Sequence, residues 1–190
     1  MHVSVRGGTH RLGPGEGTIL VRTGREGPAA RVGHDVTLRA TRWSATVAVA
    51  AGDVSASTVV AEVDAGSFEL VEATGGAMPL TDSQRHEVEQ NTRDRVLQAS
   101  THPTITFHST EVRGDQLRAL IVGEVTMRRR SGQVTLDVRS RLRGDEVIVT
   151  AFTELAQTDY GIKPYTAMLG TLRVTDVVAI TVELRFPAES

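Results

Sequence analysis

The last long stretch of the chain decides the fold class: Leu172-Arg-Val-Thr-Asp-Val-Val-Ala-Ile-Thr-Val-Glu-Leu-Arg-Phe186. Apolar residues occupy alternate positions along it, with Asp176 as the one exception. Because side chains of a strand point to the two faces of a sheet in turn, this period indicates a strand with one apolar and one polar face. The run from Val134 to Leu142 has the same period, with arginine and other polar residues between the aliphatic ones. Strands of this kind are typical of antiparallel sheets.

Turn signals divide the rest of the chain into further short alternating runs. Ala51-Gly-Asp53, Arg113-Gly-Asp115, Arg130-Ser-Gly132 and Arg143-Gly-Asp145 each lie between two such runs, as in β-hairpins. The spacing gives eight or nine strand candidates. So many antiparallel strands in one domain must form a sandwich or close into a barrel, because long unpaired edges would otherwise remain.

One segment departs from the two-residue period. Thr81 and Gln84 have the spacing of a helix capping box, and a polar run extends from there to Gln98 and ends before Pro103. The sequence therefore predicts a single helix over 81–99 with most of its surface in water.

Composition limits the classes of function. The 190 residues suit one domain, and 21 basic against 23 acidic residues leave a net charge of −2, which gives no general attraction to nucleic acid or to an anionic membrane. The longest apolar stretch without charge, Trp43 to Gly52, is too short to span a membrane. Residues 1–16 have no signal-peptide pattern, so we expect a cytoplasmic protein, with a loosely ordered tail over 1–16 and one β-barrel domain over 17–190.

Residues that carry chemistry are sparse. The chain has no cysteine, and the six histidines (His2, His10, His34, His86, His102 and His108) form no metal-ligand spacing, so no metal and no cofactor is expected. Nucleophile-elbow, phosphate-loop and dinucleotide motifs are also absent from the sequence, which favours a protein that is not an enzyme. Arg128–Arg130 fit a solvated hairpin turn better than a nucleic-acid contact.

Several motifs together resemble the YceI-like family of polyisoprenoid-binding, lipocalin-like barrels. They are the helix end with Arg93, Asp94 and Leu97, the strand Pro103-Thr-Ile-Thr-Phe-His-Ser-Thr110, the stretch Gly123-Glu-Val-Thr126, the loop Asp159-Tyr-Gly-Ile162 and the valine-rich last strand. His34 stands where that family often has a histidine in an early strand. The resemblance extends roughly from Gly17 to Phe186. The hairpin Met127-Arg-Arg-Arg-Ser-Gly132 departs from the family pattern, and the export signal that many members carry is not seen here.

The resemblance implies an eight-stranded antiparallel barrel with one capping α-helix. Its lumen would hold the apolar tail of an isoprenoid-like lipid, such as a polyprenol, a quinone or a fatty acid derivative, for carriage or sequestration. We expect the inward aliphatic side chains of the central and last strands to contact that ligand, together with two larger aromatic side chains, Phe107 and Trp43, and one histidine. The full set is His34, Trp43, Ile105, Phe107, Ala119, Ile121, Val134, Leu136, Val138, Val178, Ile180 and Val182.

The residues alone leave several alternatives open. Eight strands can enclose one small ligand or be filled by their own side chains, and the scarcity of aromatic residues favours the hollow form. His34 could bond a ligand head group or be a core histidine satisfied by a backbone carbonyl. Arg93 and Asp94 could clamp a head group or fix the helix end to a loop. The competing functions are an enzyme that uses His34 as acid–base on a bound lipid or quinone, and a filled barrel that acts as a structural or interaction module and could form a homodimer.

Overall fold

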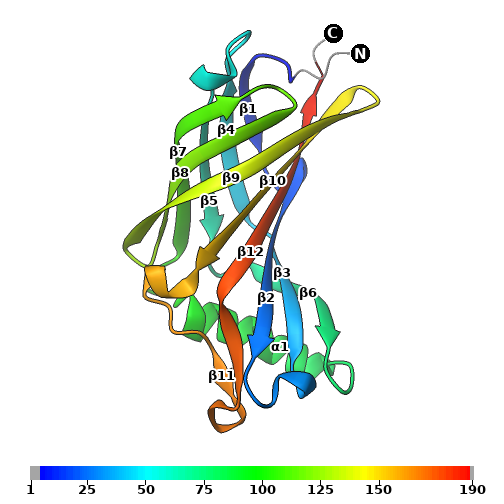
Figure 1. Ribbon diagram of the computed structural model, residues 1–190, viewed down its shortest axis with the longest axis vertical. Helices are drawn as coiled ribbons and strands as arrows, with labels where there is room; N and C mark the ends of the chain where they lie inside the picture. The colour runs from blue at the N-terminus through cyan, green and yellow to red at the C-terminus, as the bar shows by residue number, and fades with distance from the viewer. Residues whose placement is uncertain (1–4, 189–190) are drawn as a thin grey trace.

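Twelve β-strands form one antiparallel sheet that curls into a barrel in the computed structural model, which describes residues 5–188 (Figure 1). Neighbouring strands follow the order β1-β4-β5-β7-β8-β9-β10-β12-β2-β3-β6, and β11 pairs separately with β12. The strands are β1 (Gly8–Leu12), β2 (Gly17–Glu26), β3 (His34–Ala40), β4 (Trp43–Val49), β5 (Thr58–Asp64), β6 (Phe68–Gly75), β7 (Thr104–Gly114), β8 (Arg118–Met127), β9 (Arg130–Arg143), β10 (Glu146–Ala156), β11 (Thr166–Ala167) and β12 (Leu172–Pro187).

The count of twelve agrees with the predicted eight once the bends are taken into account. The chain passes from β1 to β2, from β3 to β4 and from β5 to β6 through short breaks. Each of these three pairs is one long strand with a bend in it. The bent strands pair with one another on both sides of the bend: β4 is antiparallel to β1 and β5, and β3 is antiparallel to β2 and β6. Followed through these bends, eight long strands remain beside the two-residue β11. The all-β class and the barrel with one capping α-helix are therefore confirmed.

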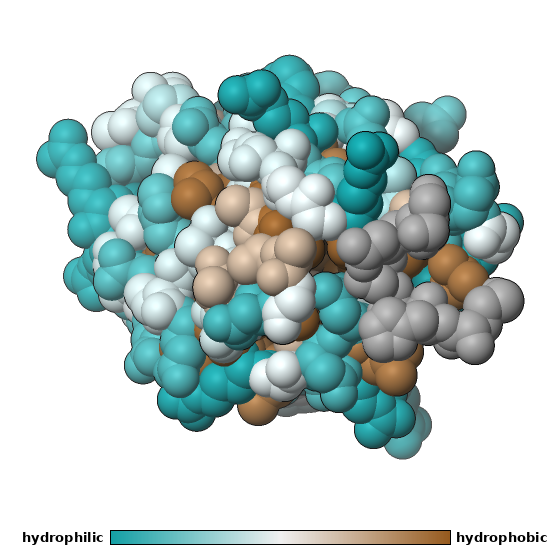
Figure 2. All heavy atoms as spheres, turned by 90° about the horizontal axis from the view of Figure 1, so that it is seen from above, coloured by the Kyte–Doolittle hydropathy of each residue, from teal (hydrophilic) through white to brown (hydrophobic). Residues whose placement is uncertain are grey.

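The two ends of the barrel differ. At the end where the termini meet, β12 pairs with β10 and β2, and Val5 forms a bridge with Ala188, so the ring of strands is continuous there. Figure 2 views this end and shows hydrophilic side chains around its outside with small apolar patches between them. At the opposite end β6 is the last strand in the order of the sheet and pairs with β3. The helix α1 (Asp82–Asn91) lies beside the other edge of β6 (Figure 1).

The prediction of a loosely ordered tail over 1–16 is wrong for the residues from Gly8 to Leu12. They form β1, which hydrogen-bonds along β4, and both Leu12 and Val5 are buried in the core at the closed end. This strand could not be predicted from the sequence, because apolar and polar side chains hardly alternate along it. Backbone pairing along the edge of β4 and burial of two aliphatic side chains stabilise it instead. Residues 1–4 lie outside the described part of the chain.

The helix begins as the sequence predicted. The Thr81 hydroxyl accepts a hydrogen bond from the Gln84 backbone N–H at 3.3 Å, and the Gln84 side chain accepts one from the Thr81 N–H at 2.9 Å. From Thr92 to Val96 the chain continues as one π-helical turn, η3. The helix also satisfies the open edge of β6, because Glu89 accepts from the Leu70 N–H and Arg85 donates to the Leu70 carbonyl, each at 2.9 Å.

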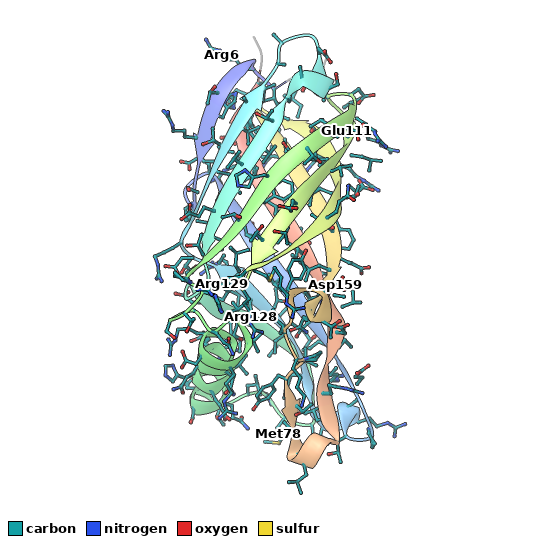
Figure 3. The ribbon with its side chains drawn as sticks, turned by 90° about the vertical axis from the view of Figure 1, so that its left-hand side faces the viewer. Arg6, Met78, Glu111, Arg128, Arg129 and Asp159 are labelled. Carbon is teal, nitrogen blue, oxygen red and sulfur yellow. The ribbon has the colours of Figure 1, made fainter. Side chains whose placement is uncertain are left out.

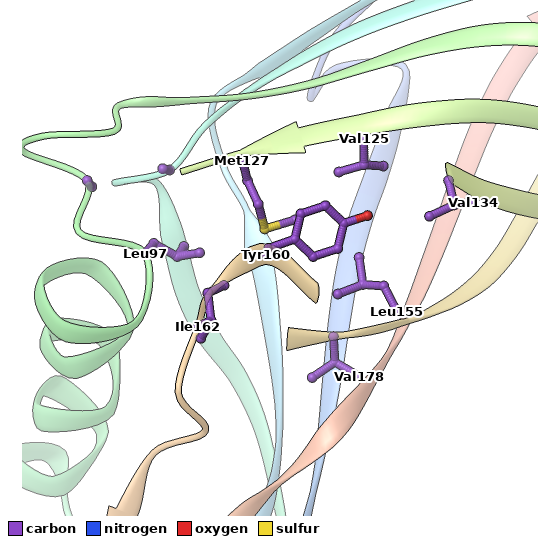
Figure 4. Close-up of a cluster of buried hydrophobic side chains, with 10 residues drawn as sticks. Leu97, Val125, Met127, Val134, Leu155, Tyr160, Ile162 and Val178 are labelled. Atoms are coloured by element: carbon purple, nitrogen blue, oxygen red, sulfur yellow. The ribbon is translucent and has the colours of Figure 1, made fainter. Parts of the chain in front are cut away.

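Two apolar clusters fill parts of the barrel. One seals the closed end around Val147 and Phe186. The other surrounds Tyr160, where the helix end, the β8–β9 hairpin and the β10–β11 connection meet (Figure 4). Short 3₁₀ turns complete the chain at η1 (Ala30–Val32), η2 (Val54–Ala56), η4 (Gln157–Tyr160) and η5 (Met168–Gly170). Among the described residues, no helix has the length and apolar character needed to cross a membrane.

Candidate ligand cavity

A cavity of about 590 Å³ lies inside the barrel. Side chains from nearly every long strand line it, and α1 and the β11–β12 segment contribute at one end. Only three of its lining residues are exposed, namely Val32, Gln84 and Arg173, and all three lie at the α1 end of the molecule. The cavity therefore opens at that end, which we call the mouth, and it runs toward Phe186 and Val47 at the closed end.

The wall of the cavity is overwhelmingly aliphatic. Aliphatic lining residues from the middle of the barrel include Ile19, Val21, Ala61, Ile121, Leu136, Val149, Ala151 and Val182. Many of these inward side chains are half-buried rather than buried, although the strands around them are paired on both sides. They keep this exposure because they face empty space inside the barrel. The structure thus rejects the filled barrel, the alternative that the strand pattern had left open.

Eleven of the twelve expected contact residues line this cavity. They are His34, Trp43, Ile105, Phe107, Ile121, Val134, Leu136, Val138, Val178, Ile180 and Val182. Ala119 does not line it. This residue pairs with Gly114 and Val138 beside the β7–β8 turn, two residues beyond Ile121 and so about 7 Å farther along the strand. The alternation of residues placed Ala119 on the inward face, but it could not show that the cavity wall at this level includes its partner Val138 and leaves out Ala119.

Polar side chains gather at the mouth. Asn91 of α1 donates from its amide to the Tyr165 hydroxyl at 3.3 Å, which joins the helix to the segment before β11, and both residues line the cavity. Deeper in the wall, the buried Gln157 donates to the Thr175 carbonyl at 2.9 Å. Sequence reasoning missed these three residues, because nothing local distinguishes them from other polar residues at the ends of helices and strands.

His34 lies at the mouth, and its ring is already engaged by the protein. Its Nε2 donates to the carbonyl oxygen of Met78 at 2.9 Å, so the bond to a backbone carbonyl that sequence reasoning considered is present. The ring packs against Gly76, whose φ of +73° and missing side chain leave room for the imidazole. Nearby, Arg25 donates to the Thr74 carbonyl at 2.9 Å. The loop around Gly75–Gly76 is therefore tethered from β2 and β3.

The arginine hairpin has a structural role that the sequence did not reveal. Arg128 and Arg129 occupy the β8–β9 turn with φ of 50° and 61° (Figure 3). The Arg128 guanidinium donates to the carbonyls of Val96 at 3.3 Å and Gly161 at 3.0 Å, and to the Gln98 side chain at 3.1 Å. The prediction of a solvated turn is therefore wrong for Arg128, which joins the hairpin, the helix end and the β10–β11 connection. Arg129 is exposed, as that prediction had it.

The Asp159–Ile162 loop supplies a wall rather than a reactive group. Tyr160 is 2% exposed, and its hydroxyl lies 3.5 Å from the Gly132 carbonyl oxygen, to which it donates. A side chain at Gly132 would collide with this phenol. Burial raises the pKa of Tyr160, with Asp159 and Glu124 adding to the effect, so the phenol stays neutral. Ile162 lies beside Tyr160 in the same cluster (Figure 4) and lines the cavity.

Within residues 5–188, the side chains of Arg93 and Asp94 bond each other and no neighbouring loop. Arg93 Nε donates to Asp94 Oδ1 at 2.9 Å, both side chains are about half exposed, and neither residue lines the cavity. Among residues 5–188, no group of three or more histidine or acidic side chains could hold a metal ion.

The barrel, its capping helix and its apolar cavity define a lipocalin-like binding protein in architecture. Comparison with known families matches residues 21–186 to the YceI-like domain, and the chain belongs to this family. Among solved structures it is similar to Burkholderia cenocepacia BcnA, with 14% identity and a TM-score of 0.67 over 89% of this chain and 95% of that one.

The chain is also similar to the YceI protein of Campylobacter jejuni, whose structure and whose cysteine variants were solved for nanotechnology applications. A cysteine variant with a monobromobimane guest has 12% identity and a TM-score of 0.60 over 80% of this chain and 85% of that one. At these identities the solved structures show a shared fold. Among curated proteins, none matches the chain.

Proposed function

We propose that the protein is a non-catalytic carrier or sequestering protein for an amphiphilic, isoprenoid-like lipid. The observation that carries this proposal is an aliphatic cavity of about 590 Å³ whose polar and exposed residues are concentrated at one open end. A volume of this order suits a single small ligand. The apolar tail would enter the lumen, and the polar head would stay at the mouth beside Asn91 and Tyr165.

Hydrophobic transfer supplies the affinity in this proposal. Each methylene group moved from water into the aliphatic lumen contributes about 0.8 kcal/mol. About a dozen such groups give useful binding even after the loss of translational and rotational freedom. The closed end, sealed around Phe186 and Val147, limits the length of tail that fits. Membership of the YceI-like family supports a lipid of the isoprenoid type, and the cytoplasmic location and the homodimer remain predictions.

Native mass spectrometry of the freshly purified chain, followed by organic extraction, tests the proposal. We expect an adduct of lipid mass that solvent releases, or uptake of an added long-chain prenol or quinone by the extracted protein. A protein that carries no adduct and takes up neither compound would contradict the proposal. Trp43 offers an independent readout, because this sole tryptophan lines the cavity and its fluorescence should change when a quinone fills the lumen.

A further inference from the structure

Four apolar side chains project from the turns that surround the cavity mouth. Val32 lies at the end of η1 between β2 and β3, Met78 in the β6–α1 loop, and Met168 and Leu169 in η5 between β11 and β12. We call these four residues the apolar rim. Figure 1 places the three turns at the same end of the molecule, and Figure 3 shows Met78 there.

The exposure of the rim is unusual within this protein. Leu169, Met78 and Met168 are the three most exposed large hydrophobic side chains of the described chain, at 106%, 75% and 56%. Met168 and Leu169 also have φ of 50° and 56°, a left-handed conformation that is unfavourable for both residue types. The fold therefore holds Leu169 fully in water and Met168 more than half exposed, both in a disfavoured backbone geometry.

The turn that carries Leu169 is held in place. The Thr171 hydroxyl donates to the Met168 carbonyl at 2.7 Å, and the Ala29 N–H donates to the Thr171 carbonyl at 3.0 Å, which ties this turn to the segment before η1. Two cations lie on segments next to these turns, Arg31 beside Val32 in η1 and Lys163 on the loop that leads to β11. Both are exposed, and neither has a carboxylate within salt-bridge distance among residues 5–188.

We propose that the apolar rim inserts into the surface of an anionic lipid bilayer, so that the cavity mouth faces the acyl chains. The four side chains lie on three separate turns at one end of the molecule, and an exposed apolar side chain on such a turn can enter a bilayer interface without a matching partner surface. Arg31 and Lys163 would then meet anionic headgroups. We assign this contact to loading and release of the ligand, and that purpose rests on the proposed function. Binding of the protein to a bilayer can be measured independently of it.

Vesicle sedimentation of the full chain tests the inference. Wild-type protein should bind phosphatidylcholine vesicles that contain phosphatidylglycerol, and Leu169→Ser should weaken this binding about tenfold. Phe152→Ser is the matched control, because Phe152 is 44% exposed on the outer face of β10, away from the mouth, and it should bind like wild type. The double variant Arg31→Glu/Lys163→Glu should lose the preference for phosphatidylglycerol.

Several results would overturn the inference: no vesicle binding by wild type, equal binding by Leu169→Ser, or self-association through the rim in place of vesicle binding. Leu169 does not line the cavity, so Leu169→Ser should take up a soluble short-chain prenol as wild type does. Failure of wild type to take up that prenol counts against the proposed function, whereas failure to bind vesicles counts only against membrane docking.

Discussion

The Nε2 of His34, on β3, donates a hydrogen bond to the carbonyl oxygen of Met78 at the cavity mouth, at 2.9 Å. This bond holds the β6–α1 loop, and with it one side of the mouth, against the barrel. His34→Phe removes the donor, so we expect faster amide hydrogen exchange in residues 75–81 and faster ligand release, with little change in the free energy of unfolding. His34→Gln keeps a side-chain N–H donor and is the control. If both variants behave alike, the hydrogen bond does not hold the loop.

A bulky side chain in the cavity wall should block tail binding. Leu136 points inward from β9 and lines the cavity, whereas its neighbour Thr135 is exposed on the outer face. We expect Leu136→Trp to weaken prenol binding about tenfold or more, because the indole occupies the lumen. The empty space should accept it with a stability change below about 1.5 kcal/mol. Thr135→Trp should bind like wild type in the same titration. Unchanged binding by Leu136→Trp would mean that the ligand does not occupy this cavity.

Arg128 should contribute to stability although it lies at a hairpin tip. Its guanidinium bonds Val96, Gly161 and Gln98, and without it these acceptors lose a charged donor. We expect Arg128→Ala to lower the free energy of unfolding by about 2 kcal/mol. The exposed neighbour Arg129 is the control, and Arg129→Ala should change the free energy of unfolding by less than about 0.5 kcal/mol. Chemical denaturation measures both, and equal effects would show that Arg128 does not join the three segments.

Asp176, the exception in the period of the last strand, should make stability depend on pH. It lies where the pairing of β12 with β2 shifts register, and its carboxylate accepts from the Thr158 hydroxyl at 2.6 Å and the Thr158 N–H at 2.9 Å. These bonds lower the pKa of Asp176 in the folded protein. Its stabilising effect is therefore complete above the unfolded pKa, about 3.9, and is lost as the pH falls through the folded pKa.

The isosteric Asp176→Asn variant measures this effect because it does not titrate. Wild type should exceed the variant in stability by a constant amount at neutral pH, and this difference should shrink once the pH falls below about 4. Thermal unfolding across that pH range is the measurement. A difference that stays constant down to the lowest pH would show that Asp176 is not the titrating group.

The sequence by itself determined the local features of this protein. The two-residue period of Leu172–Phe186 is a property of neighbouring residues, and so is the capping box of Thr81 and Gln84. Both are therefore legible without a fold. The motifs around Pro103–Thr110 and Asp159–Ile162 identified the family for the same reason. The alternation of apolar and polar residues indicated which side chains of each strand point inward. For this reason eleven of the twelve expected residues line the cavity.

Only the tertiary structure decided what the barrel encloses and how it closes. Whether the lumen is empty depends on the summed volumes of side chains from eight strands far apart in sequence, and no local pattern reports that sum. The extent of the cavity, which leaves out Ala119, has the same origin. Likewise β1 is stabilised by the edge of β4, and Arg128 bonds residues more than thirty positions away. Long-range contacts of this kind also placed the apolar rim around a single opening.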